Sequence, residues 1–171
     1  ALTLEVLITI LVILIMVVNL RASLLISSLL PVAVLMVFIM MQYTGVDANI
    51  VALAGIAIAI GTMVDVGIIL TENMLRHWQE APPDKSGLEV IYEATKEVAT
   101  AVLTAIATTI ISFIPVFALT GSAGKLFGPL AFTKTYALVA AIVVALIVIP
   151  ALAHTVFSIR FSRVRMRIGL N

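Results

Sequence analysis

The chain has 171 residues, of which 63% are hydrophobic and 11% are charged, and its formal net charge is +1. Soluble domains carry about half apolar and about a quarter charged residues, so this composition excludes an ordinary water-soluble fold and indicates an integral membrane protein. The absence of cysteine excludes disulfides and thiolate metal sites within the chain. We expect no enzyme activity, no cofactor and no nucleic-acid partner.

Long uncharged stretches predict five membrane-spanning helices, at about residues 2–20, 23–43, 49–74, 97–119 and 131–156. About 20 helical residues cross a bilayer core, and continuous apolar runs favour helices over the alternating strands of a membrane barrel. The expected fold class is therefore all-α, a polytopic helix bundle, with residues 1–171 as a single transmembrane domain. Pro31, Pro115 and Pro150 are expected to kink their helices.

Lysine and arginine are concentrated in one set of loops, which holds Arg21, the basic residues of 76–96 and the arginines of 160–167. The opposite loops hold only Lys125 and Lys134. The positive-inside rule therefore predicts a cytoplasmic C-terminus and an N-terminus on the outer side. Because the chain enters a helix within a few residues of a start that is not methionine, we expect a piece of a longer protein.

Residues 76–96 are expected to form a cytoplasmic connector. Pro82 and Pro83 break the preceding helix. Apolar residues then recur at helical spacing among charged ones, as at Leu88, Ile91 and Tyr92. This pattern predicts a short amphipathic helix, at about residues 88–96, lying along the inner membrane surface.

Asp65 is the only charged residue between Ala48 and Thr71, deep within the third expected span. A carboxylate near the bilayer centre costs about 2.5 to 3.5 kcal/mol on insertion scales, so such residues usually face a bundle interior, a water path or a cation. Spacings of four and three residues place Asp65 on one helical stripe with small and apolar side chains. The stripe comprises Ala54, Ile58, Gly61, Asp65, Ile68 and Glu72. We expect a partner helix to pack closely against Gly61.

No lysine or arginine of the chain is well placed to pair with Asp65. Lys134 begins the fifth span at the outer side, whereas Asp65 lies about 24 Å of helix rise below the outer end of the third. Two alternatives follow: the carboxyl group is protonated, or its cationic partner belongs to a helix outside this chain. A purely structural carboxyl that locks neighbouring helices in register is the competing interpretation.

Each of the other polar residues has a structural interpretation as well as a functional one. Thr104 and Thr108 could line a water path, but such hydroxyls usually bond to carbonyls of their own helix. Glu72 could pass protons, but it and Asn73 fall at the expected end of the third span, which favours capping. Met63 is the one methionine near Asp65 and a weak candidate for a soft metal ligand. The isolated histidines, His77 and His154, are expected to be structural.

Two runs resemble a known family. Residues 49–73 read NIVALAGIAIAIGTMVDVGIILTEN and resemble the fourth transmembrane helix of resistance-nodulation-division efflux pumps, in the heavy-metal branch. Residues 125–136 read KLFGPLAFTKTY and resemble that branch's signature before the sixth helix. The resemblance covers essentially the whole chain and aligns its five expected spans with the second to sixth helices of a twelve-helix inner-membrane subunit.

The resemblance implies a function and a set of partners. In the family, the aspartate that matches Asp65 belongs to a proton relay whose lysine lies in the second half of the subunit. The implied activity is proton-driven export of heavy-metal cations. The implied partners are the remainder of the subunit, a homotrimer, a periplasmic adaptor and an outer-membrane channel. A drug exporter of the same superfamily, or a membrane scaffold that transports nothing, remains an alternative.

The implied metal is copper or silver, with zinc, cobalt and cadmium as the alternative. The run around Asp65 is most similar to that of copper and silver exporters. Of the methionines that step through those pumps, only Met63 is present; the other matching positions are Val51, Leu70, Leu138 and Ala153. Zinc-group exporters carry a further aspartate six residues before the relay aspartate, where this chain has Ala59.

Overall fold

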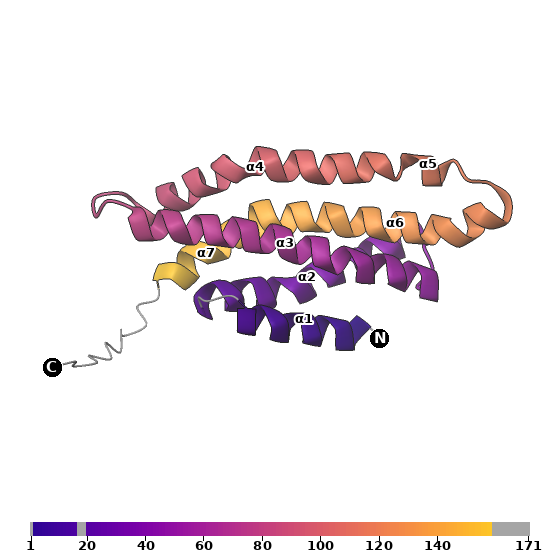
Figure 1. Cartoon of the computed structure of the whole chain (residues 1–171), viewed down its shortest axis with the longest axis horizontal. Coiled ribbons are helices and arrows are strands. Elements are labelled where there is room, and N and C mark those ends of the chain that lie inside the picture. The colour runs from indigo at the N-terminus through magenta and orange to yellow at the C-terminus, as the bar shows by residue number, and fades with distance from the viewer. Residues whose placement is uncertain (1, 17–19, 159–171) are drawn as a thin grey trace.

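The computed structural model describes residues 2–16 and 20–158, and this part of the chain is helical with no strand (Figure 1). The all-α membrane bundle expected from composition is thereby confirmed. The elements are α1 (Leu2–Met16), α2 (Leu20–Thr44), α3 (Ile50–Glu80), α4 (Gly87–Ser112), α5 (Ile114–Phe117), α6 (Gly121–Val143), the π-helical segment η1 (Val144–Val148) and α7 (Ile149–Ser158).

Four helical stretches in the described residues are long and apolar enough to cross a membrane. They are Ala22–Thr44, Ile50–Glu80, Gly87–Phe117 and Gly121–Ser158. The fifth apolar helix, α1, is shorter. Connections α2–α3 and α5–α6 lie at one end of the bundle, on the right in Figure 1, and connection α3–α4 lies at the other. We call these the α2–α3 end and the α3–α4 end.

Helix α3 lies at the centre of the bundle and packs against α2, α4, α6 and α7. Of the three glycines in α3, Gly55 lies closest to a neighbouring helix: an added Cβ would overlap the Thr133 hydroxyl and lie 2.8 Å from the Leu130 carbonyl oxygen of α6. Small residues allow such approach of helix backbones, which gains van der Waals contact where lipid supplies no hydrophobic driving force. Gly55 therefore defines the seam between α3 and α6.

Gly61 does not make the close contact that we expected. A Cβ added there would meet no atom within 4 Å, and the residue is exposed. Within this chain the expectation was wrong because α3 carries small residues on two faces. The face with Gly55 and Ala59 is buried, whereas the face with Gly61 is open.

Two helix boundaries also differ from the sequence-based expectation. Residues 87–112 form one continuous helix, so the separate surface helix expected at 88–96 is wrong, and Ser86 caps α4 by accepting a hydrogen bond from the Glu89 N–H. Helix α3 continues to Glu80, beyond the expected end at 74, and stops before Pro82 and Pro83. The charged residues at the end of α3 and at the start of α4 therefore lie within these two long helices.

The three expected proline kinks take different forms. Pro31 lies inside α2. Pro115 lies in the one-turn helix α5, which follows the end of α4 at Ser112. Pro150 is the second residue of α7, just after η1, and the Ile149 N–H bonds to the Val144 carbonyl oxygen. Because proline has no N–H, it removes one helical hydrogen bond, and a π-type turn next to it re-satisfies part of the backbone.

The glycine seam predicts a difference between two conservative substitutions in the full-length protein. Gly55→Ala should lower stability by about 1 to 3 kcal/mol, because the new methyl group forces α3 away from backbone and hydroxyl atoms of α6. Gly67→Ala is the matched control: it is also buried in α3, but its Cβ meets only the ends of Ile26 and Ile149, at 3.4 and 3.9 Å. Thermal unfolding in detergent should show a lower transition for Gly55→Ala alone; equal transitions would contradict the seam.

Candidate functional site

Asp65 lies near the middle of α3, on a face that no other part of the described chain covers. The exposed positions of this face are Ala54, Ile58, Gly61, Asp65, Ile69, Glu72 and Arg76. Two of its apolar members, Ile58 and Ile69, are 56% and 52% exposed. The buried residues of α3 occupy the opposite face, which includes Ile56, Met63 and Leu70. Five of the six residues of the stripe expected from the sequence lie on this open face, whereas Ile68 is half-buried and Ile69 is exposed in its place.

The Asp65 side chain makes no hydrogen bond or ion pair within the described residues. Lys134 is not close to it along the bundle. Thr133 meets Gly55, so Lys134 is level with Gly55, and Asp65 lies ten residues further along α3, about 15 Å of helix rise. The Lys134 ammonium instead lies over the Phe113 ring, 4.3 Å from its centroid.

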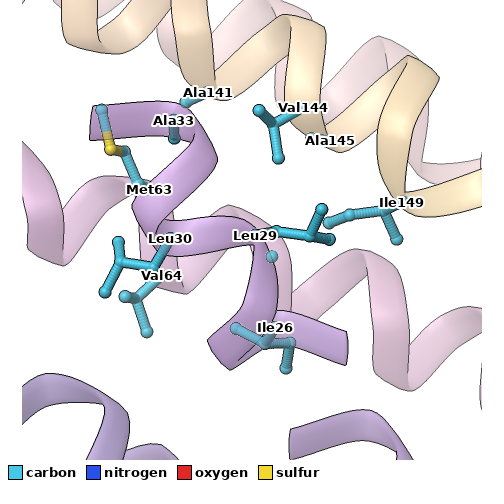
Figure 2. A pocket seen from close by; sticks show the side chains of 11 residues that line it. Ile26, Leu29, Leu30, Ala33, Met63, Val64, Ala141, Val144, Ala145 and Ile149 are labelled. Carbon is cyan, nitrogen blue, oxygen red and sulfur yellow. The ribbon is translucent and has the colours of Figure 1, made fainter. Parts of the chain in front are cut away.

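Met63 points to a different part of the bundle from Asp65. It is 7% exposed and lines a small apolar cavity of about 20 Å³ between α2, α3 and the α6–η1 region. Figure 2 shows its sulfur near Ala33 and Leu30, and the cavity lining contains no second methionine, cysteine or histidine. The described residues also contain no cluster of three histidine, cysteine or acidic side chains. One thioether among aliphatic side chains does not make a metal site, because soft-metal sites need several ligands.

The threonines of α4 use their hydroxyls locally. The Thr104 hydroxyl donates to the Thr100 carbonyl oxygen and the Thr108 hydroxyl to the Thr104 carbonyl oxygen, both at 2.8 Å. Both residues are exposed. The structure therefore shows the local bonding that the sequence favoured, and it brings neither hydroxyl into contact with Asp65.

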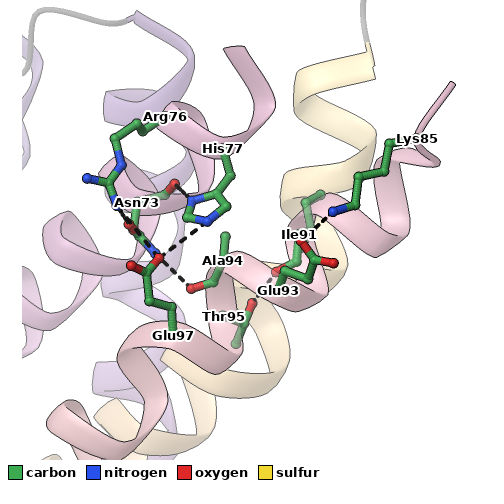
Figure 3. Close-up of polar contacts among 9 residues, drawn as sticks. All are labelled: Asn73, Arg76, His77, Lys85, Ile91, Glu93, Ala94, Thr95 and Glu97. Carbon is green, nitrogen blue, oxygen red and sulfur yellow. Dashed lines mark hydrogen bonds and ion pairs between the residues drawn. The ribbon is translucent and has the colours of Figure 1, made fainter. Parts of the chain in front are cut away.

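Asn73 joins α3 to α4, which sequence reasoning missed. Its side-chain amide donates to the Ala94 carbonyl oxygen at 2.8 Å and to Glu97 Oε2 at 3.0 Å (Figure 3). The Arg76 guanidinium donates to Asn73 Oδ1 at 2.7 Å and lies 3.6 Å from Glu97. The capping role expected for Glu72 and Asn73 is wrong, because α3 continues past both residues. Glu72 is exposed and has no partner within the described chain.

The signal for this junction was present in the sequence. Asn73 and Arg76 are three residues apart and share a face, and Glu97 offers the opposite charge at the start of the next expected span. The missing information was that α4 begins ten residues before that span and brings Glu97 beside α3.

Both histidines occupy structural positions at the α3–α4 end. His77 Nδ1 lies 3.0 Å from the Asn73 carbonyl oxygen, and Nε2 lies 3.3 Å from Glu97. The His154 ring packs edge-on against Trp78, with ring centroids 6.3 Å apart. In the nearby loop, a hydrogen bond to Glu93 raises the pKa of Lys85 above its ordinary value. These contacts tie α3, α4 and α7 together and leave Asp65 as the unpaired charge at mid-helix.

Comparison with known proteins gives consistent matches. The model of the AcrB/AcrD/AcrF family matches residues 1–167. The cation efflux system protein CusA of Escherichia coli (strain K12) is 44% identical over an alignment of 142 residues, and the match covers 78% of this chain and 14% of that protein. The cobalt-zinc-cadmium resistance protein CzcA of Cupriavidus metallidurans is 32% identical over an alignment of 140 residues, and the match covers 78% of this chain and 13% of that protein.

A solved structure agrees with these matches. The crystal structure of a heavy metal efflux pump superposes with a TM-score of 0.72 at 31% identity, over 90% of this chain and 15% of that one. The chain thus spans about one seventh of the length of its relatives, and the family match covers nearly all of its residues. The chain belongs to the AcrB/AcrD/AcrF family of resistance-nodulation-division pumps, and its relatives include heavy-metal cation exporters.

Proposed function

We propose that the chain forms part of the proton-translocating membrane domain of a secondary active exporter of heavy-metal cations, and that Asp65 carries the proton. The observation that carries this proposal is the position of Asp65: an unpaired carboxyl group at mid-helix on the open face of α3. Intramembrane carboxyl groups of this kind mark proton and ion paths, because nothing else offsets the cost of placing them in lipid.

The mechanism follows from the charge of one side chain. An ionised Asp65 attracts a cationic group from the remainder of the subunit, which would cover the open face of α3. Protonation removes the charge, weakens that attraction and lets the two parts of the membrane domain shift against each other; proton release restores the pairing. The two states differ in interaction free energy at Asp65, which allows a proton gradient to drive the change.

The proposed cargo is a heavy-metal cation, with copper or silver as first choice. Support comes from the names of the relatives and from the 44% identity to CusA, compared with 32% to CzcA. Met63 is buried among aliphatic side chains without a second soft ligand, so metal capture is assigned to the remainder of the protein. By the same reasoning, the partners proposed are that remainder, two further copies in a homotrimer, a periplasmic adaptor and an outer-membrane channel.

The proposed location is the bacterial inner membrane, with the α2–α3 end facing the periplasm and the α3–α4 end facing the cytoplasm. The asymmetry of lysine and arginine supports this orientation. Two alternatives differ in the role that they give to Asp65. A drug exporter would share the Asp65 relay, whereas a scaffold module would use Asp65 only to dock helices. A full-length sequence that contains a second mid-membrane cation favours an exporter over a scaffold.

Replacing Asp65 tests the relay. Asp65→Asn in the full-length protein keeps the side-chain volume but removes titration, so proton-coupled metal flux in reconstituted vesicles should fall by about 100-fold or more. Insertion and assembly should be unchanged, because a neutral amide is cheaper to bury than a carboxylate.

The matched control is Asp84→Asn, the same chemical change in the exposed α3–α4 loop, which should leave flux unchanged. Near-normal flux in Asp65→Asn at equal protein levels would defeat the relay and leave the docking role standing.

Replacing Met63 tests whether the membrane part selects the metal. Met63→Leu conserves apolar volume in the cavity, so we expect copper tolerance within about twofold of the wild type and a change in stability below about 1.5 kcal/mol. Loss of tolerance at normal expression would reveal a membrane metal site that includes Met63.

The absence of cysteine in the chain permits a clean test of orientation. In a cysteine-free full-length protein, Ser122→Cys at the α2–α3 end should react with a membrane-impermeant maleimide in cells whose inner membrane is intact. Asp84→Cys at the α3–α4 end should react only after permeabilisation. The opposite pattern would reverse the proposed orientation.

A further inference from the structure

A polar pocket lies at the α2–α3 end of the bundle, about 22 Å of helix rise from Asp65. It has a volume of about 430 Å³ and forms between the turn that leads into α3 and the first turns of α6. Gly128 lies in its wall, and a Cβ added there would meet no atom within 4 Å. The pocket therefore has room for a ligand of several non-hydrogen atoms.

Two opposite charges line this pocket without neutralising each other. Asp47 and Lys125 both belong to its lining and are both exposed. The ion pairs of the described chain lie elsewhere, at the α3–α4 end, and neither of these two side chains has a hydrogen bond. A ligand that carries both a negative and a positive group would satisfy both residues.

The other residues that line the pocket supply a hydrogen-bond donor and an apolar side chain. Asn49 Oδ1 accepts a hydrogen bond from the Ala52 N–H at 2.8 Å, which leaves the Asn49 amide N–H groups as donors at the pocket. Phe132 is 41% exposed and packs against Phe117, with ring centroids 4.9 Å apart. Phe117 is also 41% exposed. The pocket thus places its charged side chains next to an exposed apolar surface that acyl chains can contact.

We propose that this pocket binds the headgroup of a phospholipid that carries a primary amine. The phosphate lies against Lys125 and the Asn49 amide, the ammonium group donates to the Asp47 carboxylate, and the acyl chains follow Phe132 and its apolar neighbours. A primary ammonium donates N–H hydrogen bonds to a carboxylate, whereas a trimethylammonium group has no N–H to donate. A glycerol headgroup would leave Asp47 without a cation beside a lipid phosphate. Charged pockets between membrane helices bind headgroups in this way.

The test measures lipid binding to the delipidated full-length protein by native mass spectrometry, with phosphatidylethanolamine, phosphatidylcholine and phosphatidylglycerol of identical acyl chains. The wild type should bind the ethanolamine lipid about fivefold more tightly than the other two. Asp47→Asn should abolish this preference, because the amide has no charge to attract the ammonium group. Lys125→Gln should weaken binding of all three lipids.

Two further variants separate the pocket from general charge effects. Gly128→Leu adds a side chain to the pocket wall at a position where a Cβ meets no atom within 4 Å, and leucine is the better helix former, so this variant should fold and lose the preference. Lys85→Gln makes the same charge change as Lys125→Gln at the α3–α4 end and should bind lipids as the wild type does.

Equal binding of the three lipids by the wild type, or a preference that survives Gly128→Leu, would overturn the proposal. No lipid uptake at this site would show that another part of the protein fills the pocket, which also overturns it. Soluble glycerophosphoethanolamine that competes as strongly as the lipid would assign the pocket to a soluble dipolar solute. None of these results depends on metal flux, so they are independent of the relay.

Discussion

The contact between α3 and α6 at Gly55 sets the rotation of the central helix, and the positions of Met63, Asp65 and Glu72 depend on that rotation. Because Gly55 has no side chain, the α3 backbone approaches Thr133 and the Leu130 carbonyl of α6 directly. This contact turns Met63 and Leu70 into the bundle. It leaves Asp65 on the opposite face, which the described helices do not cover.

An uncovered carboxyl group at mid-helix is the costly feature of this arrangement. The cost of a charge at the bilayer centre exceeds the gain from an exposed ion pair such as that between Arg76 and Glu97, which solvent screens. A nearby cation or protonation lowers the cost at Asp65. In the proposed relay, the charge state of this residue changes how strongly the open face of α3 attracts the remainder of the membrane domain.

Much of the fold could be predicted from the sequence, because continuous apolar runs and the break at Pro82 and Pro83 indicate where membrane helices lie. The junction of Asn73, Arg76 and Glu97 could not, since these contacts form only when α3 and α4 meet. Helical spacing placed Asp65 and Gly61 on one stripe correctly. It did not say whether that stripe is buried, because Gly55 and Ala59 offer a second stripe of small residues, and only packing against α6 decides between them.

The central claim is that Asp65 binds and releases a proton, and infrared difference spectroscopy of the full-length protein in lipid vesicles tests it most directly. Lowering the pH should produce carbonyl bands of protonated carboxylic acids, and the wild-type spectrum should contain a component that is missing in Asp65→Asn and retained in Asp84→Asn. A wild-type difference spectrum that matches that of Asp65→Asn at every pH would show that Asp65 does not titrate, and would contradict the account.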